Sequence, residues 1–263
     1  MPPLTGGLRS GLMDDAARAR AQLAIAVLDL TDLSADASEA GADALCHRAA
    51  AAGTAAVCVW PAFVARCVEH LNGTGVRVAT VINFPTGDEP LERATSVAAA
   101  AVAAGADELD VVLPYRAWLA GDVQVAEDML IAVRQEAGDR VMKVIIESGS
   151  LTDPAAIDRA SHFAIANGAD FVKTSTGKTD VSATPEAAEI ILEAIDVSGR
   201  PVGFKASGGI RTLADANVYL DLAETIMGSG WPTPQTFRFG ASGLLDALQR
   251  DLAGTPAASD SDY

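Results

Sequence analysis

The chain has 263 residues, 49% of them hydrophobic and 21% charged, which is enough to bury a large core in one domain or two. Its formal net charge of −16 argues against nucleic acid and against an anionic membrane surface as partners, because both are polyanionic. An anionic small molecule is not excluded, since a cleft can carry a local charge opposite to the net charge.

Neither the N-terminus nor the cysteines indicate export. Residues 1–7 lack the basic and apolar regions of a signal peptide, and the apolar run 21–28 is too short to cross a bilayer. Cys46, Cys58 and Cys67 have spacings that fit neither a zinc site nor a disulfide framework. The three histidines lie on predicted helices, where they form neither a catalytic triad nor a metal site. We therefore expect a reduced, cytoplasmic protein that uses no metal and no cofactor.

The sequence predicts a regular alternation of helices and strands. A helix over 13–23 precedes the first strand, and glycine or asparagine-glycine ends most of the later helices. Asp122, Asp153, Thr184, Thr212 and Ser242 are predicted N-caps, two of them followed by proline at the first helical position. The predicted strands are 25–31, 55–60, 77–83, 108–113, 142–147, 171–178, 202–209 and 236–240.

Eight such βα units in about 250 residues are typical of a (β/α)8 TIM barrel, here with an additional N-terminal helix. We expect residues 1–253 to form this single domain. Residues 254–263 are polar and are expected to form a mobile C-terminal tail.

Five predicted strands carry a charge at a position where a packed barrel would hold an apolar side chain. The five residues are Asp29, Asp110, Lys143, Lys173 and Lys205. A balanced internal salt-bridge network would account for any one of them, but buried ion pairs are weak stabilisers, so five together indicate an active site. Two buried lysines on successive strands would also repel each other, which makes an amine nucleophilic.

The loops after the last three strands indicate a phosphate site. Residues 176–178, 207–209 and 240–242 place small residues where backbone N–H groups can point at an anion, and barrels bind phosphate at this end. Ser242 alone could be a simple helix cap, but three such loops together favour a phosphate site.

Four segments resemble signature motifs of the deoxyribose-phosphate aldolase family. They are ELDVV at 108–112, FVKTSTG at 171–177, GFKASGGIR at 203–211 and FRFGAS at 237–242, and the similarity runs in order from about Leu28 to the end. This resemblance implies a metal-free class I aldolase on a TIM barrel. The family cleaves 2-deoxy-D-ribose 5-phosphate to D-glyceraldehyde 3-phosphate and acetaldehyde through a lysine Schiff base.

The resemblance also implies roles for single residues. Lys173 would form the Schiff base, Lys205 would activate it, Asp110 would act as the acid/base partner, and Tyr263 would match a C-terminal tyrosine that folds over the site in longer members. Gly243 stands where some members have a second serine. The substrate-binding residues expected from the loops and the resemblance are Asp29, Thr31, Cys46, Thr176, Gly177, Lys178, Ser207, Gly208, Gly209, Gly240 and Ser242.

Simple electrostatics supports the lysine pair. Two ammonium groups about 4 Å apart at an effective dielectric near 20 repel by roughly 4 kcal/mol, or about 3 pKa units. A lysine pKa would fall from about 10.4 to about 7–8, where the amine is largely neutral and still basic.

Two other functions remain open. A barrel isomerase or epimerase could use Glu147 or Asp110 as its base, with the lysines as electrostatic clamps, and a non-catalytic sugar-phosphate binder could use the same loops. In each case the partners are small phosphorylated sugars and aldehydes, not nucleic acid or membrane. We further expect a homo-oligomer, with a dimer favoured, because barrels commonly dimerise.

Overall fold

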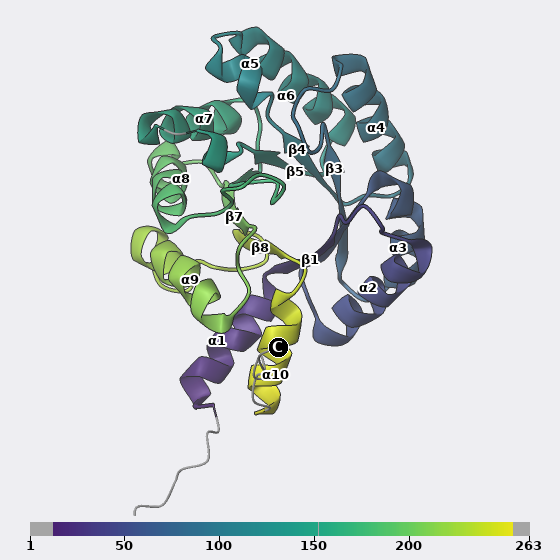
Figure 1. Cartoon of the computed structure of the whole chain (residues 1–263), viewed down its shortest axis with the longest axis vertical. Coiled ribbons are helices and arrows are strands. Elements are labelled where there is room, and N and C mark those ends of the chain that lie inside the picture. The colour runs from purple at the N-terminus through teal and green to yellow at the C-terminus, as the bar shows by residue number, and fades with distance from the viewer. Residues whose placement is uncertain (1–12, 152, 255–263) are drawn as a thin grey trace, which may run out of the picture.

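The computed structural model describes residues 13–151 and 153–254, and these residues form a closed barrel of parallel strands (Figure 1). The strands pair in chain order, and β8 closes the barrel against β1. Their bounds are β1 Leu28–Asp32, β2 Ala56–Val59, β3 Arg77–Ile82, β4 Glu108–Val112, β5 Val141–Ile145, β6 Phe171–Lys173, β7 Gly203–Ser207 and β8 Phe237–Ala241. The predicted TIM barrel is confirmed.

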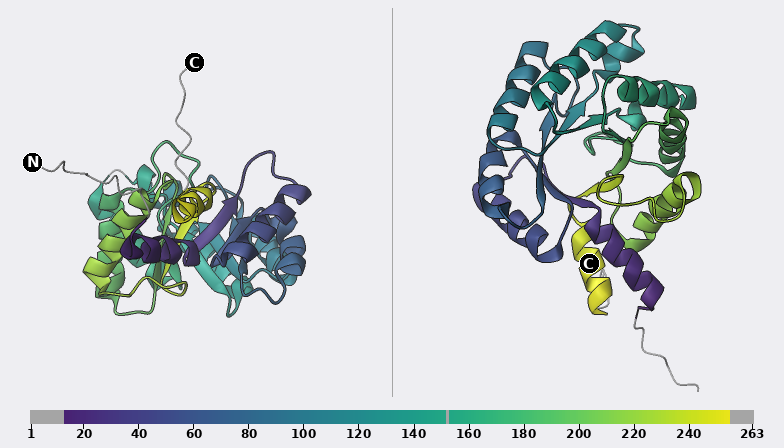
Figure 2. Two further views of the ribbon diagram at one scale, coloured as in Figure 1. Left: turned by 90° about the horizontal axis from the view of Figure 1, so that it is seen from below. Right: turned by 180° about the vertical axis from the view of Figure 1, so that it is seen from behind.

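Helices form a ring around the strands (Figure 1), and the buried apolar residues of the larger ones, such as α6, α8 and α9, belong to the same core as the strands. The N-terminal helix α1 lies beside α10, as both views in Figure 2 show, so the predicted additional helix is also confirmed. The helix bounds are α1 Asp15–Ala26, α2 Glu39–Ala52, α3 Val64–Leu71, α4 Leu91–Ala103, α5 Tyr115–Leu119, α6 Val123–Ala137, α7 Pro154–Ala166, α8 Pro185–Ser198, α9 Leu213–Met227 and α10 Leu244–Ala253. No helix within this described part of the chain is long and apolar enough to cross a membrane.

Three of the predicted N-caps form their side-chain hydrogen bonds. Asp153, Thr184 and Thr212 each accept from a backbone N–H in the first turn of the following helix. Asp122 occupies the cap position of α6 without such a bond. The prediction for Ser242 was wrong, because α10 begins one residue later, with Gly243 as its N-cap.

Two further differences concern the end of β6 and a short helix that the sequence did not indicate. The strand predicted over 171–178 ends at Lys173, because the following residues leave the sheet and bond to neighbouring loops. The short helix α5 was missed because five residues are too few to show a helical period. Since the strands are parallel, all their carboxyl ends meet at one rim, where the loops after β6, β7 and β8 lie together.

Candidate active site

Seven charged side chains meet inside the barrel, and each of these residues is at most 3% exposed. Five are the residues expected from the sequence, and Glu108 and Arg238 join them. The network consists of Asp29 on β1, Glu108 and Asp110 on β4, Lys143 on β5, Lys173 on β6, Lys205 on β7 and Arg238 on β8. Lys173 and Lys205 are register neighbours on adjacent strands, as the sequence indicated.

Asp110 is the centre of this network. Its Oδ1 accepts a hydrogen bond from Lys143 at 2.7 Å. Its Oδ2 accepts from Lys173 at 2.8 Å and from Lys205 at 2.7 Å. One carboxylate therefore lies between the two lysines that were expected to repel each other.

The remaining carboxylates bind the other cations. Asp29 accepts from Lys205 at 2.5 Å and from Arg238 at 2.5 Å. Glu108 pairs with Lys143 at 2.5 Å and accepts from Arg238 at 2.8 Å. Asp29 thus belongs to the interior of the barrel and holds Lys205 in place.

All three carboxylates are held ionised. Burial works to raise the pKa of Asp110, but Lys143, Lys173 and Lys205 outweigh it and bring the pKa well below the usual value. The pKa values of Asp29 and Glu108 are lowered in the same way, against burial, by Arg238 and the nearby lysines.

The three lysines differ in how many carboxylates they contact. Lys143 lies within 3.5 Å of three carboxylates and Lys205 contacts two, and these partners outweigh burial and raise the pKa of both amines. Lys173 contacts only Asp110 among the described residues. Burial, followed by the charge of Lys205, therefore lowers its pKa despite Asp110.

This geometry corrects the simple picture of two repelling ammonium groups. Desolvation is the leading cause of the lowered pKa of Lys173, and repulsion by Lys205 adds to it. The network holds four basic groups and three carboxylates, so its formal charge is balanced when one base is neutral. Lys173 is the base whose pKa is lowered, and it is the group best suited to be that neutral amine.

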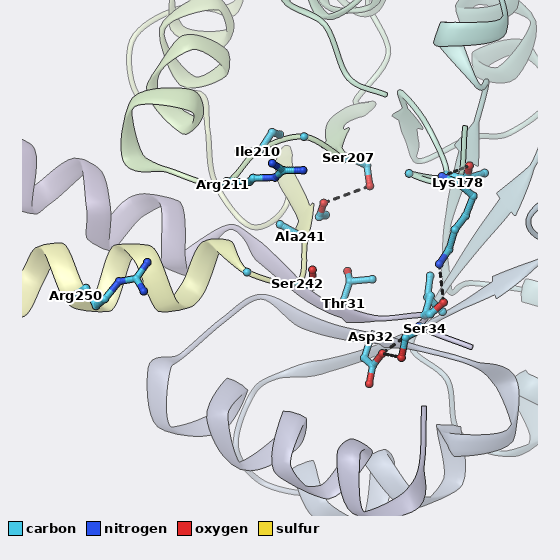
Figure 3. Close-up of a pocket in the computed structure, with 17 residues that line it drawn as sticks. Thr31, Asp32, Ser34, Lys178, Ser207, Ile210, Arg211, Ala241, Ser242 and Arg250 are labelled. Carbon is cyan, nitrogen blue, oxygen red and sulfur yellow. Dashed lines mark hydrogen bonds between the residues drawn. The ribbon is translucent and has the colours of Figure 1, made fainter. Parts of the chain in front are cut away.

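A cavity of about 560 Å³ opens at the carboxyl rim of the barrel, and Figure 3 shows residues that line it. Its walls come from the end of β1 and the loops after β6, β7 and β8. The lining residues on these loops are Thr176–Lys178, Ser207–Arg211 and Gly240–Gly243, and Thr31–Ser34 and Arg250 complete the wall. Lys205 lies two residues before Ser207 on β7, or about 7 Å deeper at the usual strand rise.

The cavity lining suits an anion. Gly177 and Gly208 have φ values of 73° and 84°, and a Cβ built on Gly208 would lie 3.3 Å from the Cα of Gly177, so the two loops approach closely. Lys178, Arg211 and Arg250 add three cationic side chains to the wall (Figure 3). Lys178 extends across the cavity rim and donates to the carbonyl oxygen of Leu33 at 2.8 Å.

Most of the predicted substrate-binding residues line this cavity. Two do not: Asp29 lies in the charged network below it, and Cys46 is buried on α2, where its thiol faces Cys67 of α3. Tyr263 lies outside the described residues. The predicted residues on the cavity wall are Thr31, Thr176, Gly177, Lys178, Ser207, Gly208, Gly209, Gly240 and Ser242.

The cysteine near the lysines is Cys58, which lies on β2 and is fully buried. Burial and the charge of Asp110 raise the pKa of its thiol, and Lys205 and Lys173 oppose this change. Cys58 lies on a barrel strand, whereas Cys46 lies on α2 outside the barrel.

The two charged residues that the sequence analysis missed, Glu108 and Arg238, could have been found from the alternation of side chains along a strand. Glu108 lies two residues before Asp110 on β4, so both side chains point to the same face. Arg238 alternates with Phe237 and Phe239 on β8. Its guanidinium contacts both Asp29 and Glu108, as the Lys143 amine does from β5.

Comparisons with known proteins identify the family of this chain. The model of the DeoC/LacD family of aldolases matches residues 23–250. A deoxyribose-phosphate aldolase from Agrobacterium fabrum is 49% identical over 251 residues, which cover 94% of this chain and 97% of that protein.

Solved structures show the same architecture. A structure from Coccidioides immitis has a TM-score of 0.80 at 32% identity, covering 88% of this chain and 86% of that one. A structure from Toxoplasma gondii has a TM-score of 0.84 at 22% identity, covering 94% and 99%, and supports the fold alone. Because the family match spans 228 residues and a relative is this similar over nearly its whole length, the chain belongs to the DeoC/LacD family of aldolases.

Proposed function

We propose that this aldolase reversibly cleaves 2-deoxy-D-ribose 5-phosphate to D-glyceraldehyde 3-phosphate and acetaldehyde, with Lys173 as the Schiff-base nucleophile. The observation that carries the proposal is the placement of Lys173: a buried lysine with one carboxylate partner, a lowered pKa, and an anion-binding cavity above its strand. The name of the Agrobacterium relative supports the choice of substrate.

The first half of the reaction forms the iminium. Neutral Lys173 adds to the aldehyde carbon C1 of the open-chain sugar, and the carbinolamine oxygen takes up protons and leaves as water. Asp110 lies 2.8 Å from the Lys173 amine and 2.7 Å from the Lys205 ammonium. Asp110 can therefore pass protons between Lys173 and Lys205, directly or through a water molecule. In this scheme the Lys205 ammonium is the proton donor for the carbinolamine.

The second half breaks the carbon–carbon bond. The C3 hydroxyl loses its proton to Asp110 through a water molecule, the C2–C3 bonding pair moves to the iminium, and the products are D-glyceraldehyde 3-phosphate and an enamine on Lys173. The enamine is then protonated at C2 and hydrolysed to acetaldehyde. We assign the C2 proton to the phenol of Tyr263, the last residue of the chain, because none of the predicted strand residues supplies an obvious donor at that carbon.

The phosphate would bind at the cavity rim. Backbone N–H groups around Gly177, Gly208 and Gly209, together with the hydroxyl of Ser242, are suited to a dianion. Lys178 and Arg211 add positive charge on the same wall. Lys205 lies about 7 Å below Ser207 of the rim at the usual strand rise, and this separation suits a five-carbon sugar phosphate bound at both ends.

The alternative functions fit the site less well. An isomerase that uses Asp110 as its base would need no amine with a lowered pKa beside that carboxylate, and Lys173 is such an amine. Glu147, the other candidate base, already accepts hydrogen bonds from the N–H and the hydroxyl of Thr176 in the loop after β6. A binding protein would need no buried lysine with a lowered pKa.

The proposal is tested by incubating the purified protein with 2-deoxy-D-ribose 5-phosphate and measuring release of acetaldehyde. The parent should release acetaldehyde, and Lys173→Met should not, because no other lysine in the network combines burial with a single carboxylate partner. A folded parent that isomerises or merely binds the sugar phosphate without releasing acetaldehyde contradicts the proposal.

We also expect the enzyme to act as a homo-oligomer, with a dimer favoured. A deoxyribose-phosphate aldolase from Aeropyrum pernix, 25% identical with a TM-score of 0.73, is described as a tetramer, which supports association in this family. Light scattering coupled to size-exclusion chromatography measures the state of this chain directly.

A further inference from the structure

Glu147 follows β5 and is fully buried, yet it lies outside the seven-residue charged network. Its φ of 52° is in the left-handed region, which a residue with a side chain rarely adopts. The residues on either side still bond to the chain of β6: Ile146 N–H donates to Lys173 O at 3.0 Å, and Ser148 N–H donates to Thr174 O at 2.8 Å. The unusual backbone of Glu147 is therefore fixed between two bonds to the nucleophile's own strand and its extension.

Among residues 13–151 and 153–254, the donors to the Glu147 carboxylate all belong to the loop after β6. The Thr176 N–H lies 3.3 Å from both carboxylate oxygens, and the Thr176 hydroxyl donates to Oε2 at 2.6 Å. The Thr179 hydroxyl lies 3.2 Å from Oε1. The described residues provide no cationic partner within 4 Å, so these loop donors are what compensates its burial.

The contact continues on the backbone beyond Glu147. A Cβ built on Gly149 would lie 2.1 Å from the carbonyl oxygen of Val181, which belongs to the same loop. The segment 147–150 thus touches the loop after β6 both through the Glu147 side chain and through the bare backbone of Gly149. This second contact requires glycine because any side chain would push the loop away.

The loop held in this way forms one wall of the cavity. Thr176 Oγ1 also accepts from the Lys178 N–H at 3.1 Å, so its proton is directed to Glu147 and the turn at Gly177 is closed. Thr176, Gly177 and Lys178 all line the cavity, and Gly177 meets Gly208 of the neighbouring loop. A displacement of this turn would alter both loops that face the expected phosphate.

We propose that Glu147 is a positioning residue, which holds the turn at 176–179 in the conformation that binds the anionic end of the substrate. The inference rests on the proposed function for the identity of that substrate. It assigns Glu147 no proton transfer, because its oxygens already accept hydrogen bonds from the loop.

Four variants separate positioning from catalysis. Glu147→Gln keeps one oxygen for Thr176, and its amide can donate to Thr179 Oγ1, whose hydroxyl also lies 3.0 Å from Val181 O. Glu147→Leu removes the acceptor, and Gly149→Ala disturbs the second contact with the same loop, at Val181, while leaving Glu147 intact. Ser161→Ala is the control, because it removes another buried hydroxyl, bonded to Ile157 O within α7.

The measurements are steady-state kinetics with 2-deoxy-D-ribose 5-phosphate, the rate of borohydride trapping with acetaldehyde, and amide hydrogen exchange of residues 174–180. Glu147→Leu and Gly149→Ala should raise KM about 10-fold or more and speed amide exchange, with acetaldehyde trapping within about threefold of the parent. Glu147→Gln should stay within about threefold of the parent in KM, and Ser161→Ala should match the parent.

Two outcomes would overturn the inference. One is a parent-like KM and amide protection in both Glu147→Leu and Gly149→Ala. The other is a collapse of acetaldehyde trapping in Glu147→Gln, which would make Glu147 a base. If the parent itself neither traps acetaldehyde nor turns over, the proposed function fails, and the amide exchange of the variants still decides whether Glu147 holds the loop.

Discussion

Lys173 donates a single hydrogen bond to Asp110, at 2.8 Å, and contacts no other carboxylate among the described residues. Lys205, one strand away, contacts two carboxylates. The two amines are therefore equally buried but unequally paired, and their pKa values move in opposite directions. This difference in pairing explains why only one of two neighbouring lysines is suited to be a nucleophile.

Replacement of Lys205 tests the electrostatic part of this account. Lys205→Met removes a cation that lowers the pKa of Lys173, so that pKa should rise and less neutral amine should be present at a given pH. The rising limb of the pH profile for adduct formation should then move to higher pH by about 1 unit or more. A profile that coincides with the parent's, in a variant whose circular dichroism is unchanged, would remove Lys205 from the mechanism.

Replacement of Arg238 tests the network as a stabilising unit. Arg238→Met leaves Asp29 and Glu108 with one partner fewer in the barrel interior, and we expect the free energy of unfolding at pH 7 to fall by about 3–5 kcal/mol. Arg93→Met, whose side chain is 69% exposed, is the control and should change stability by less than about 1 kcal/mol.

The same variant has a predicted pH dependence. Asp29 and Glu108 have lowered pKa values in the folded protein, so their contribution is complete above about pH 5 and is lost as the pH falls toward the folded values. Arg238 strengthens that lowering, and the difference between parent and Arg238→Met should shrink from pH 5 to pH 3. Urea unfolding at both pH values measures it, and a constant difference would mean that the loss is one of packing alone.

Ser242 tests the anion site without a confounding loss of structure. Ser242→Glu places a carboxylate on the cavity wall and should raise KM for the phosphorylated sugar by about 10-fold or more, with little effect on the exchange of acetaldehyde protons. Because Ser242 does not cap α10, Ser242→Ala should unfold at the parent's temperature. Equal damage by Ser242→Glu to both reactions would point to a general disturbance of the site.

The role of Tyr263 remains a prediction, since this residue lies outside the described part of the chain. Tyr263→Phe should still form the borohydride-trappable adduct, because the phenol is not needed for attack on the aldehyde. It should exchange acetaldehyde methyl protons with D₂O far more slowly, and kcat should fall more than KM rises. Exchange at the parent's rate would show that the C2 proton comes from elsewhere.

The fold was predictable because its signals are local and repeated. Apolar strands, glycine after helices, and caps such as Thr184 and Thr212 each recur at the spacing of a βα unit. The exact end of β6 was not predictable, because residues 174–178 are as compatible with a strand as 171–173 are. They leave the sheet through tertiary bonds, including those from Ser175 to Ser207 O and from Thr176 to Glu147.

The site was predictable in its residues and less so in its energetics. Charges on apolar strands identified Lys173, Lys205 and Asp110, but the sequence does not reveal that a carboxylate lies between the lysines. Nor does it reveal that Glu108 and Arg238 complete the network, because only the closed barrel brings β4 opposite β8. The contact of Glu147 with the loop after β6 was also not predictable, because it depends on a left-handed backbone at a residue that is not glycine.

The most direct test of the central claim is reduction with borohydride in the presence of acetaldehyde, followed by peptide mapping. The geometry predicts one modified lysine, Lys173, with no adduct on Lys143 or Lys205, since those amines are held protonated by two or more carboxylates. An adduct on either of those residues, or no adduct on the folded parent, would contradict the assignment of Lys173 as the nucleophile.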